Sequence, residues 1–316
     1  MKDLILFGDC RETLKEFDEK ARMCVTSPPY YGLRNYGGEG NQIGQENTPE
    51  EFIQQLVEVF RGVRDCLTDD GTLWVNMGDS YYNYRPGKGQ KLSKQTVASN
   101  DQDLPENCPR RGNKLEGLKE KDLIGIPWML AFALRADGWY LRQDIIWHKP
   151  NPMPESVRDR CTKSHEYIFL LSKNKRYYYD NEAIKEPAKD WGTRDRSKGK
   201  YHNEGTGLNP HSGLSKSYPT KNKRSVWSVT NKPYKGAHFA VYPPDLIEPC
   251  IKAGSQEGDI ILDPFMGSGT TAMVAKKLGR HYIGCELHED YGNLILDRVP
   301  DEEVSQEPTV NILDLI

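Results

Sequence analysis

One segment near the C-terminus constrains the fold more than any other. Residues 260–263 form a short apolar run that ends in an acid, residues 264–269 contain two glycines, and residues 270–278 have a helical composition. A strand, a tight glycine turn and a helix in this order are typical of a doubly wound α/β sheet. In such sheets these turns lie at the carboxyl ends of the strands, where ligands bind. The segment therefore predicts an α/β fold with a ligand site at the turn.

The rest of the chain alternates in the same way. Seven short apolar or β-branched runs predict strands, at residues 4–7, 23–26, 73–77, 144–148, 167–171, 260–263 and 282–286. Apolar residues at helical spacing predict helices over residues 52–67, 123–136, 244–253 and 270–278. Asp70 and Gly71 are expected to stop the first of these helices. This alternation predicts a mostly parallel seven-stranded sheet with helices on both faces.

The charge is unevenly distributed. The chain of 316 residues has a net charge of −3, which by itself argues against a nucleic-acid partner. Residues 173–235, however, hold 15 basic against 6 acidic residues, and residues 85–122 hold 9 against 6. Both segments are poor in apolar residues, and aromatic residues are interleaved with the positive charge of the longer one. These are features of loops that bind nucleic acid, although purely solvated loops are the alternative.

Cysteine usage and hydropathy narrow the class of protein. The seven cysteines are scattered and form no CxxC pair, so neither a disulfide framework nor a zinc site is expected and no metal is predicted. No apolar run reaches the length of about 18 residues that a membrane span requires, and no secretory signal is recognisable at the start. We therefore expect a cytoplasmic protein without a membrane partner.

The glycine turn favours a particular kind of cofactor. A phosphate-binding P-loop needs a lysine before the Ser/Thr, and a dinucleotide site needs a third glycine; both are missing from residues 263–273. Asp263 followed by Gly-Ser-Gly suits a cofactor with an ammonium group. Glu286, at the end of the next predicted strand, is placed to accept hydrogen bonds from ribose hydroxyls. The alternative is a tight turn that closes an ordinary βα unit.

A second motif follows the strand at residues 23–26. It reads Ser27-Pro28-Pro29-Tyr30, and its two prolines fix the backbone and remove two N–H donors. Carbonyl and hydroxyl acceptors next to an aromatic ring can hold an exocyclic amino group while the ring stacks on its base. The alternative is a rigid loop with a surface tyrosine.

Together the two motifs resemble those of amino-group DNA methyltransferases, which use S-adenosylmethionine and release S-adenosylhomocysteine. The order, with residues 26–30 first and residues 263–271 last, resembles the circularly permuted β class of that family. The resemblance also covers residues 138–173 and 238–251, and it implies a permuted Rossmann-like methyltransferase fold with an inserted target-recognition region.

The resemblance assigns roles to the matching residues. Ser27 and the Pro28 carbonyl would orient the target amine, and Pro29 would keep the turn rigid while Tyr30 stacks on the flipped base. The implied cofactor contacts are Asp9, Cys10, Asp263, Pro264, Phe265, Gly267, Ser268, Gly269, Thr270, Thr271 and Glu286. Within this set Asp9 would meet the adenine amino group, Glu286 the ribose, and the glycine turn the methionine moiety.

Serine at the first position of the motif resembles the cytosine-N4 enzymes. The implied reaction is therefore site-specific methylation of cytosine N4 in double-stranded DNA, on a base flipped out of the duplex. Because a hydroxyl is a weak acceptor, we expect an acid to assist; Asn76 and Asp79 follow a predicted strand, and only Asp79 can take a proton. Adenine-N6 methylation, methylation of RNA or of a glutamine amide, and a non-catalytic DNA-binding subunit remain open.

The resemblance also divides the chain. Residues 1–84 and 123–185 would form the catalytic part, residues 235–299 the cofactor-binding part, and residues 300–316 a tail. Residues 85–122 would be a mobile basic loop, and residues 186–234 the target-recognition region. Double-stranded DNA is the implied partner, and a cognate restriction endonuclease would accompany a restriction–modification enzyme. The sequence indicates no particular oligomeric state.

Overall fold

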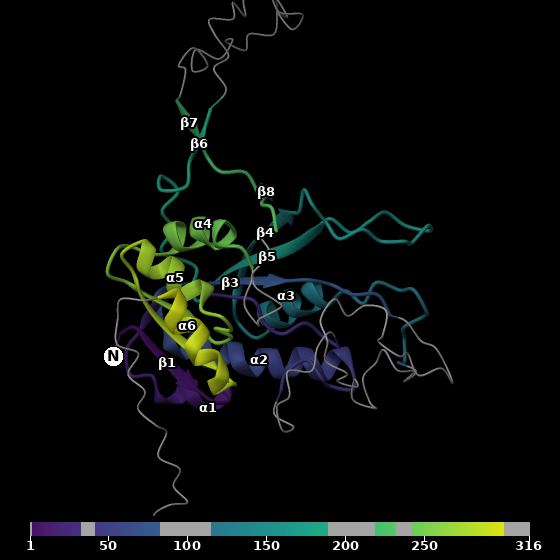
Figure 1. Cartoon of the computed structure of the whole chain (residues 1–316), viewed down its shortest axis with the longest axis horizontal. Coiled ribbons are helices and arrows are strands. Elements are labelled where there is room, and N and C mark those ends of the chain that lie inside the picture. The colour runs from purple at the N-terminus through teal and green to yellow at the C-terminus, as the bar shows by residue number, and fades with distance from the viewer. Residues whose placement is uncertain (1, 33–41, 83–114, 189–218, 232–241, 300–316) are drawn as a thin grey trace, which may run out of the picture.

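An eight-stranded sheet forms the centre of the molecule in the computed structural model (Figure 1). The structure describes residues 2–32, 42–82, 115–188, 219–231 and 242–299. The strands of the sheet are β1 (Leu4–Phe7), β2 (Ala21–Thr26), β3 (Leu67–Met77), β4 (Tyr140–His148), β5 (His165–Ser172), β8 (Val226–Ser228), β9 (Ile260–Asp263) and β10 (His281–Glu286). Their order across the sheet is β1-β10-β9-β2-β3-β5-β4-β8.

Strand direction decides which residues meet. The neighbours from β1 to β3 pair in parallel, β5 runs antiparallel to both β3 and β4, and β4 pairs in parallel with β8. The carboxyl ends of β1, β10, β9, β2, β3 and β4 therefore lie at one edge of the sheet, together with the first residues of β5. We call this the carboxyl edge.

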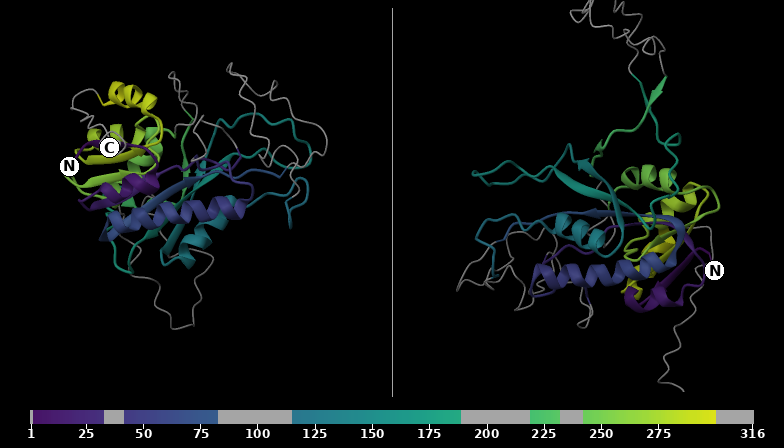
Figure 2. Two further views of the ribbon diagram at one scale, coloured as in Figure 1. Left: turned by 90° about the horizontal axis from the view of Figure 1, so that it is seen from below. Right: turned by 180° about the vertical axis from the view of Figure 1, so that it is seen from behind.

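Helices cover both faces of the sheet, as the sequence predicts (Figure 2). One face packs against α1 (Cys10–Thr13), α2 (Pro49–Cys66) and α3 (Ile126–Ala136). The other packs against α4 (Pro244–Gly254), α5 (Thr270–Lys277) and α6 (Gly292–Arg298). Short 3-10 turns at Leu14–Glu16 and Glu289–Tyr291 extend α1 and precede α6. The result is the three-layer α/β architecture expected of a Rossmann-like fold.

The longest helix illustrates how the sequence forms these layers. The Thr48 hydroxyl caps α2 by accepting a hydrogen bond from the Glu51 amide, and the Glu51 carboxylate accepts one from the Thr48 amide. Pro49 occupies the first turn of the helix. Phe52 and Phe60 are fully buried on its inner face. Each such side chain stabilises the fold by about 1.5–3 kcal/mol.

All seven predicted strands and all four predicted helices are present. The eighth strand, β8, was not expected, because it is only three residues long and lies in the basic segment assigned to target recognition. It pairs with β4 through Trp147 and Trp227, and Trp227 is buried. Part of residues 186–234 thus belongs to the main sheet.

Several boundaries differ from the sequence prediction: β3 begins at Leu67 rather than at residue 73, and β4 begins at Tyr140 rather than at residue 144. The helix α2 ends at Cys66, and Asp70 and Gly71 lie inside β3 rather than stopping the helix. A Cβ on Gly71 would lie 2.9 Å from the Thr68 carbonyl oxygen, so the strand folds tightly there. The helix α3 begins at Ile126, three residues later than predicted, because Gly125 at its N-cap has a φ of 87°.

Residues that flank the two longest stretches outside the described part of the chain pair with each other. The Tyr82 amide donates to the Asp122 carbonyl and the Lys121 amide to the Tyr82 carbonyl, which brings the two sides of residues 83–114 together. Likewise β6 (Glu186–Pro187) pairs with β7 (Thr220–Lys221) on either side of residues 189–218. Most of the predicted basic loop, much of the target-recognition region and the tail at 300–316 lie outside the described residues. Within the described part of the chain, no helix is long and apolar enough to cross a membrane.

Candidate active site at the carboxyl edge

The two sequence motifs meet at the carboxyl edge. The strands β2 and β9 are neighbours, with Cys24 opposite Leu262, so the residues that follow them lie side by side. Thr26, the last residue of β2, donates its hydroxyl to Asp263 Oδ1 at 2.6 Å. Motifs separated by more than 200 residues in the sequence therefore form one site.

Asp263 is an organising residue of this site. It is 1% exposed and also accepts hydrogen bonds from the Phe265 amide (3.0 Å), the Tyr242 hydroxyl (3.1 Å) and the Thr271 hydroxyl. Burial raises the pKa of its carboxyl group, while these donors act in the opposite direction. These four hydrogen bonds fix the conformation of the glycine turn. A cofactor ammonium group that bound Asp263, as predicted, would compete with these four donors for its carboxylate oxygens.

Hydrogen bonds from α6 also stabilise the glycine turn. Arg298, the last residue of α6, donates to the carbonyl and the hydroxyl of Ser268 and to the Thr270 hydroxyl. Gly269 has a φ of 79°, and a Cβ there would lie 3.0 Å from Ile295, so glycine is required. Because the hydroxyls of Thr270 and Thr271 are engaged by protein, the first-turn N–H groups of α5 are the better candidates for a cofactor carboxylate.

Glu286 lies at the end of β10, where the sequence analysis expects a ribose-binding acid. Its Oε2 accepts a hydrogen bond from the Gly267 amide (2.7 Å) and its Oε1 one from the His288 amide (3.1 Å). The residue is 7% exposed, and burial raises the pKa of its carboxyl group to about 7. Each oxygen keeps a lone pair for a further donor.

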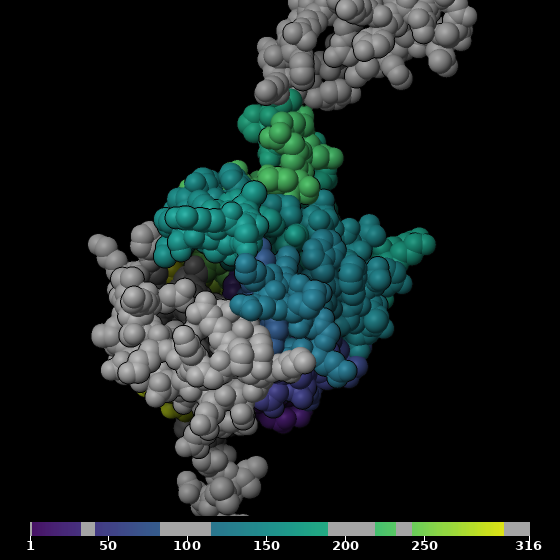
Figure 3. Space-filling model, turned by 90° about the vertical axis from the view of Figure 1, so that its right-hand side faces the viewer, coloured from purple at the N-terminus to yellow at the C-terminus, as the bar shows by residue number. Residues whose placement is uncertain are grey.

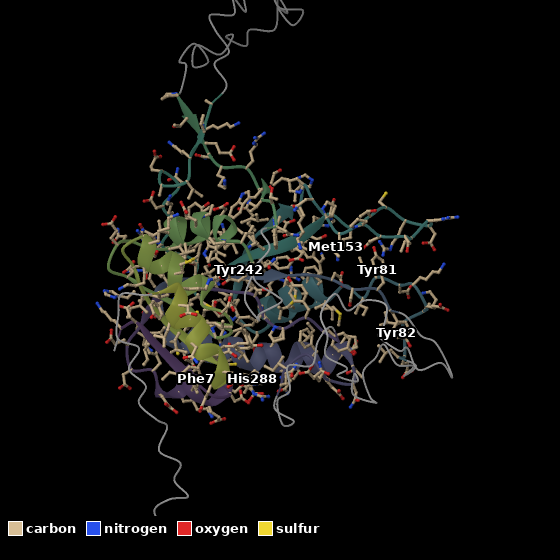
Figure 4. The ribbon with its side chains drawn as sticks, viewed as in Figure 1. Phe7, Tyr81, Tyr82, Met153, Tyr242 and His288 are labelled. Carbon is tan, nitrogen blue, oxygen red and sulfur yellow. The ribbon has the colours of Figure 1, made fainter. Side chains whose placement is uncertain are left out.

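The surroundings of Glu286 fit a nucleoside. His288 Nε2 is buried and has no hydrogen-bond partner among the residues that the structure describes. Phe7, at the end of β1, lies against Gly292, where a Cβ would approach its ring to 3.1 Å. Figure 4 shows Phe7 and His288 at the same end of the molecule. An unsatisfied imidazole nitrogen, an apolar ring and a buried carboxylate are together suited to a ribose and an attached base.

Asp9 and Cys10 have protein partners at this end of the site. Asp9 caps α1 by accepting from the Arg11 amide (2.9 Å), and it also pairs with the Arg11 guanidinium. Burial opposes ionisation of Asp9, but the bonds and charge of Arg11 outweigh it and lower the pKa. The Cys10 thiol is packed in the core, where burial raises its pKa well above the usual range. A contact from Asp9 to an adenine amino group, which the resemblance implies, would share the carboxylate with Arg11.

The Ser-Pro-Pro-Tyr turn lies beside the glycine turn. Ser27, Pro29 and Tyr30 are partly exposed, whereas Pro28 is buried. The Tyr30 ring packs on the backbone of Gly78, since a Cβ at Gly78 would lie 2.5 Å from the ring. The Tyr30 hydroxyl donates to Glu166 Oε2 at 2.7 Å, so the ring is held at both its face and its tip.

Asn76 and Asp79 occupy different positions relative to this turn. Asn76 Oδ1 lies 3.3 Å from the Ser27 hydroxyl, which donates to it. Asp79 Oδ1 instead accepts from the amides of Ser80, Gly125 and Ile126, at 2.9–3.1 Å, and thereby caps α3. The geometry explains Asp79 as a helix cap, and the proton-accepting role predicted for it has no contact to support it.

Three residues of the site were not predicted from the sequence: Glu166, Tyr242 and Arg298. Glu166 and Lys149 form an ion pair next to Tyr30, and Asn76 Nδ2 donates to Glu166 at 3.3 Å. The signal for Glu166 would have been strand direction, because a residue that begins an antiparallel strand reaches the same edge as residues that end parallel ones. Tyr242 lies in residues 238–251, which the resemblance covers without assigning a role to this tyrosine, and Arg298 lies outside the segments that carry the resemblance.

Two segments, residues 115–125 and 149–164, contact each other next to the ends of β3 and β4 (Figure 3). Lys121 forms an ion pair with Asp159 (2.6 Å), Arg160 lies over the Tyr81 ring, and Lys163 donates to the Asp79 carbonyl (3.0 Å). Met153, in the second segment, is 79% exposed. Among the described residues, no group of three or more His, Cys, Asp or Glu side chains could hold a metal ion.

Comparison with known proteins agrees with this geometry. The DNA methylase family model for N6 and N4 methyltransferases matches residues 21–297. The chain is 48% identical to the type II methyltransferase M.SmaI of Serratia marcescens, over 93% of this chain and 90% of that protein. It is 43% identical to M.Cfr9I of Citrobacter freundii, over 94% and 88% of the two chains.

Solved structures show the same fold. The cytosine-N4-specific PvuII DNA methyltransferase superposes with a TM-score of 0.62 at 18% identity, covering 96% of this chain and 89% of that one. The complex of M1.HpyAVI with S-adenosylmethionine superposes with a TM-score of 0.52 at 18% identity, covering 93% and 98%.

Proposed function

The chain belongs to the family of N6 and N4 DNA methylases, and from this premise we propose that it transfers a methyl group from S-adenosylmethionine to the N4 amino group of a cytosine in double-stranded DNA. The observation that carries the proposal is the contact between Thr26 and Asp263, because it joins the turn that would hold the amine to the turn that would hold the cofactor. The relatives named above are type II methyltransferases, and we infer a role in a type II restriction–modification system.

The residues of the site would act on the amine by positioning. An exocyclic amino group is conjugated into its ring, so its lone pair becomes nucleophilic only when its hydrogens are drawn out of the ring plane. The Pro28 carbonyl and the Ser27 oxygen supply two acceptors on a rigid turn. Bound S-adenosylmethionine supplies an electrophilic methyl group. Catalysis then depends on alignment and on fixed dipoles rather than on a covalent adduct.

Ser27 is the basis for preferring cytosine N4. The resemblance that places serine at this position in cytosine-N4 enzymes comes from the motif alone, and the adenine N6 amino group presents the same two hydrogens to the same acceptors. Adenine-N6 methylation is therefore the second candidate, and the experiment must separate the two bases.

DNA would reach the site across the two basic segments. We propose that residues 186–234 recognise the target sequence and that residues 85–122 close over the DNA, because both segments are rich in lysine and arginine. Their lysines and arginines would contact phosphates, so affinity for DNA is expected to fall steeply with salt.

Methylation of a plasmid tests the proposal. The purified protein and S-adenosylmethionine are incubated with unmethylated plasmid, which is then sequenced by a method that distinguishes N4-methylcytosine from N6-methyladenine. We expect N4-methylcytosine at one short recurring sequence, and no modification by the Ser27→Ala variant. Modified adenine would favour the second candidate, and absence of any modification by the folded wild-type protein would refute both.

A further inference from the structure

We propose that Glu166 is a positioning residue for methyl transfer, which sets the orientation of Ser27 through Asn76 and of Tyr30 directly. The inference rests on the proposed function, because it concerns how the same turn holds its substrate. Glu166 was not predicted from the sequence, and neither motif contains it.

The location of Glu166 follows from the topology. It is the second residue of β5, the antiparallel strand, and lies opposite Trp147 of β4 at the carboxyl edge. Its side chain is 14% exposed, and its Oε1 pairs with Lys149 Nζ. Lys149 in turn lies 4.1 Å from the centre of the Trp147 ring. The carboxylate is thus anchored on one oxygen and presents the other to the site.

The second oxygen fixes the tip of Tyr30. A phenol has one proton, and two acceptors lie near it, Glu166 Oε2 at 2.7 Å and Asn76 Oδ1 at 3.4 Å. The shorter bond to the charged acceptor is the stronger one, so the proton lies toward Glu166. Together with the packing of the ring on Gly78, this bond holds the plane on which a flipped base would stack.

The same oxygen fixes the amide of Asn76. Asn76 Nδ2 donates one hydrogen to Glu166 Oε2 (3.3 Å) and the other to the Tyr167 carbonyl (3.1 Å). With both hydrogens committed, Oδ1 must face Ser27, whose hydroxyl it accepts at 3.3 Å.

This arrangement orients the hydroxyl group of Ser27. Because its proton points to Asn76, the lone pairs of its oxygen are left to accept from the target amine. If the Ser27 hydroxyl could rotate freely, some of the molecules would point its proton at the target amine. In those molecules Ser27 could not accept a hydrogen bond from the amine. The chain of bonds from Lys149 through Glu166 and Asn76 therefore prepares Ser27 as an acceptor.

The test is a comparison of the Glu166→Gln variant with wild type in single-turnover methylation, which reports transfer rather than product release. A glutamine keeps the shape but places an NH₂ group toward Tyr30, Asn76 or Lys149, each of which needs an acceptor. The rate of transfer should fall about 10- to 100-fold, the usual effect of losing a hydrogen bond to a charged group. The dissociation constants for S-adenosylmethionine and DNA should change less than about threefold, because the cofactor turn is not part of this network.

Two further variants make the result specific. Glu248→Gln removes another lysine-paired carboxylate, on α4, where Glu248 pairs with Lys252 (2.7 Å) and Lys277 (3.1 Å), and it should leave the rate unchanged. Tyr30→Phe removes the phenol, and in that background Glu166→Gln should cost clearly less than it does alone. Strictly multiplicative losses would show that Glu166 does not act through Tyr30.

The outcomes separate this inference from the proposed function. An active wild-type enzyme with an equally active Glu166→Gln variant overturns the role of Glu166 and leaves the function standing. An inactive but folded wild-type protein overturns the function itself. If Glu166→Gln does not fold, Lys149→Gln is measured instead; it leaves Glu166 in place without its anchor, and a rate equal to wild type would also overturn the inference.

Discussion

Replacing Glu286 by glutamine should change how stability and cofactor binding depend on pH. The carboxylate of Glu286 is buried and accepts from the amides of Gly267 and His288. Burial raises its pKa from an ordinary 4.5 to about 7. A glutamine has one oxygen and cannot accept both amides with equal geometry, but it does not titrate.

The magnitude follows from the two pKa values. Because the pKa in the folded state lies above that in the unfolded state, the contribution of this group to stability is complete below pH 4.5 and is lost as the pH rises through 7. The difference between the two pKa values corresponds to about 3 kcal/mol of free energy of unfolding. Without cofactor, wild type should lose this amount between pH 4.5 and 8 relative to the variant.

Cofactor binding should show the opposite trend. Ribose hydroxyls donate hydrogen bonds, so they bind the ionised carboxylate and favour it. The affinity of wild type for S-adenosylmethionine should therefore weaken as the pH falls below 7, and binding at pH 7 should release about half a proton from Glu286. In the variant this part of the pH dependence should disappear, and affinity at pH 8 should be about 10- to 100-fold lower.

Urea unfolding at several pH values and calorimetric titration in buffers of different ionisation enthalpy measure the two effects. Comparing the variant with wild type cancels the titration of every other group, including those of the cofactor. The reasoning would be refuted by parallel stability curves for the two proteins across pH 4.5–8, or by equal proton release on binding.

Three other substitutions test separate parts of the site. Tyr242→Phe removes a donor to the buried Asp263, and urea unfolding should show a loss of about 1–3 kcal/mol; an unchanged midpoint would contradict the described network. Gly269→Ala places a Cβ 3.0 Å from Ile295 at a φ of 79°, so we expect a loss of at least about 1 kcal/mol of stability and weaker cofactor binding. Gly117→Ala is the strained but uncrowded control, because Gly117 is exposed, has a φ of 81°, and its Cβ would meet nothing within 4 Å. Asp79→Asn keeps the capping oxygen and should retain methyl transfer at every pH, whereas Asp79→Ala should lose about 0.5–2 kcal/mol of stability; a pH-dependent loss of transfer in Asp79→Asn would restore the proton-accepting role.

The strands and the two motifs could be predicted because their signals are local. An apolar run followed by a glycine turn, or by two prolines, is visible within about ten residues, and parallel pairing then brings such turns to one edge. The contact between Thr26 and Asp263 depends in addition on β2 and β9 being neighbours, which the two local motifs do not show.

The remaining residues of the site depend on non-local information. Glu166 reaches the carboxyl edge only because β5 runs antiparallel to β3 and β4. The amino-acid composition of a strand does not indicate its direction in the sheet. The capping contacts of Asp79 could not be read from the sequence for a related reason: the donors, which are the amides of Gly125 and Ile126, are more than 40 residues away in the sequence. Similarly, β8 is too short to have a periodic signal and is stabilised by its pairing with β4.

Isotope labelling tests the central claim most directly. Wild-type protein is incubated with unmethylated duplex DNA and S-adenosylmethionine that carries a deuterated methyl group, and the DNA is digested to nucleosides for mass spectrometry. The account predicts N4-methylcytosine that retains all three deuterium atoms, and none from the Ser27→Ala variant. Label found in N6-methyladenine or 5-methylcytosine, with none at cytosine N4, would contradict it.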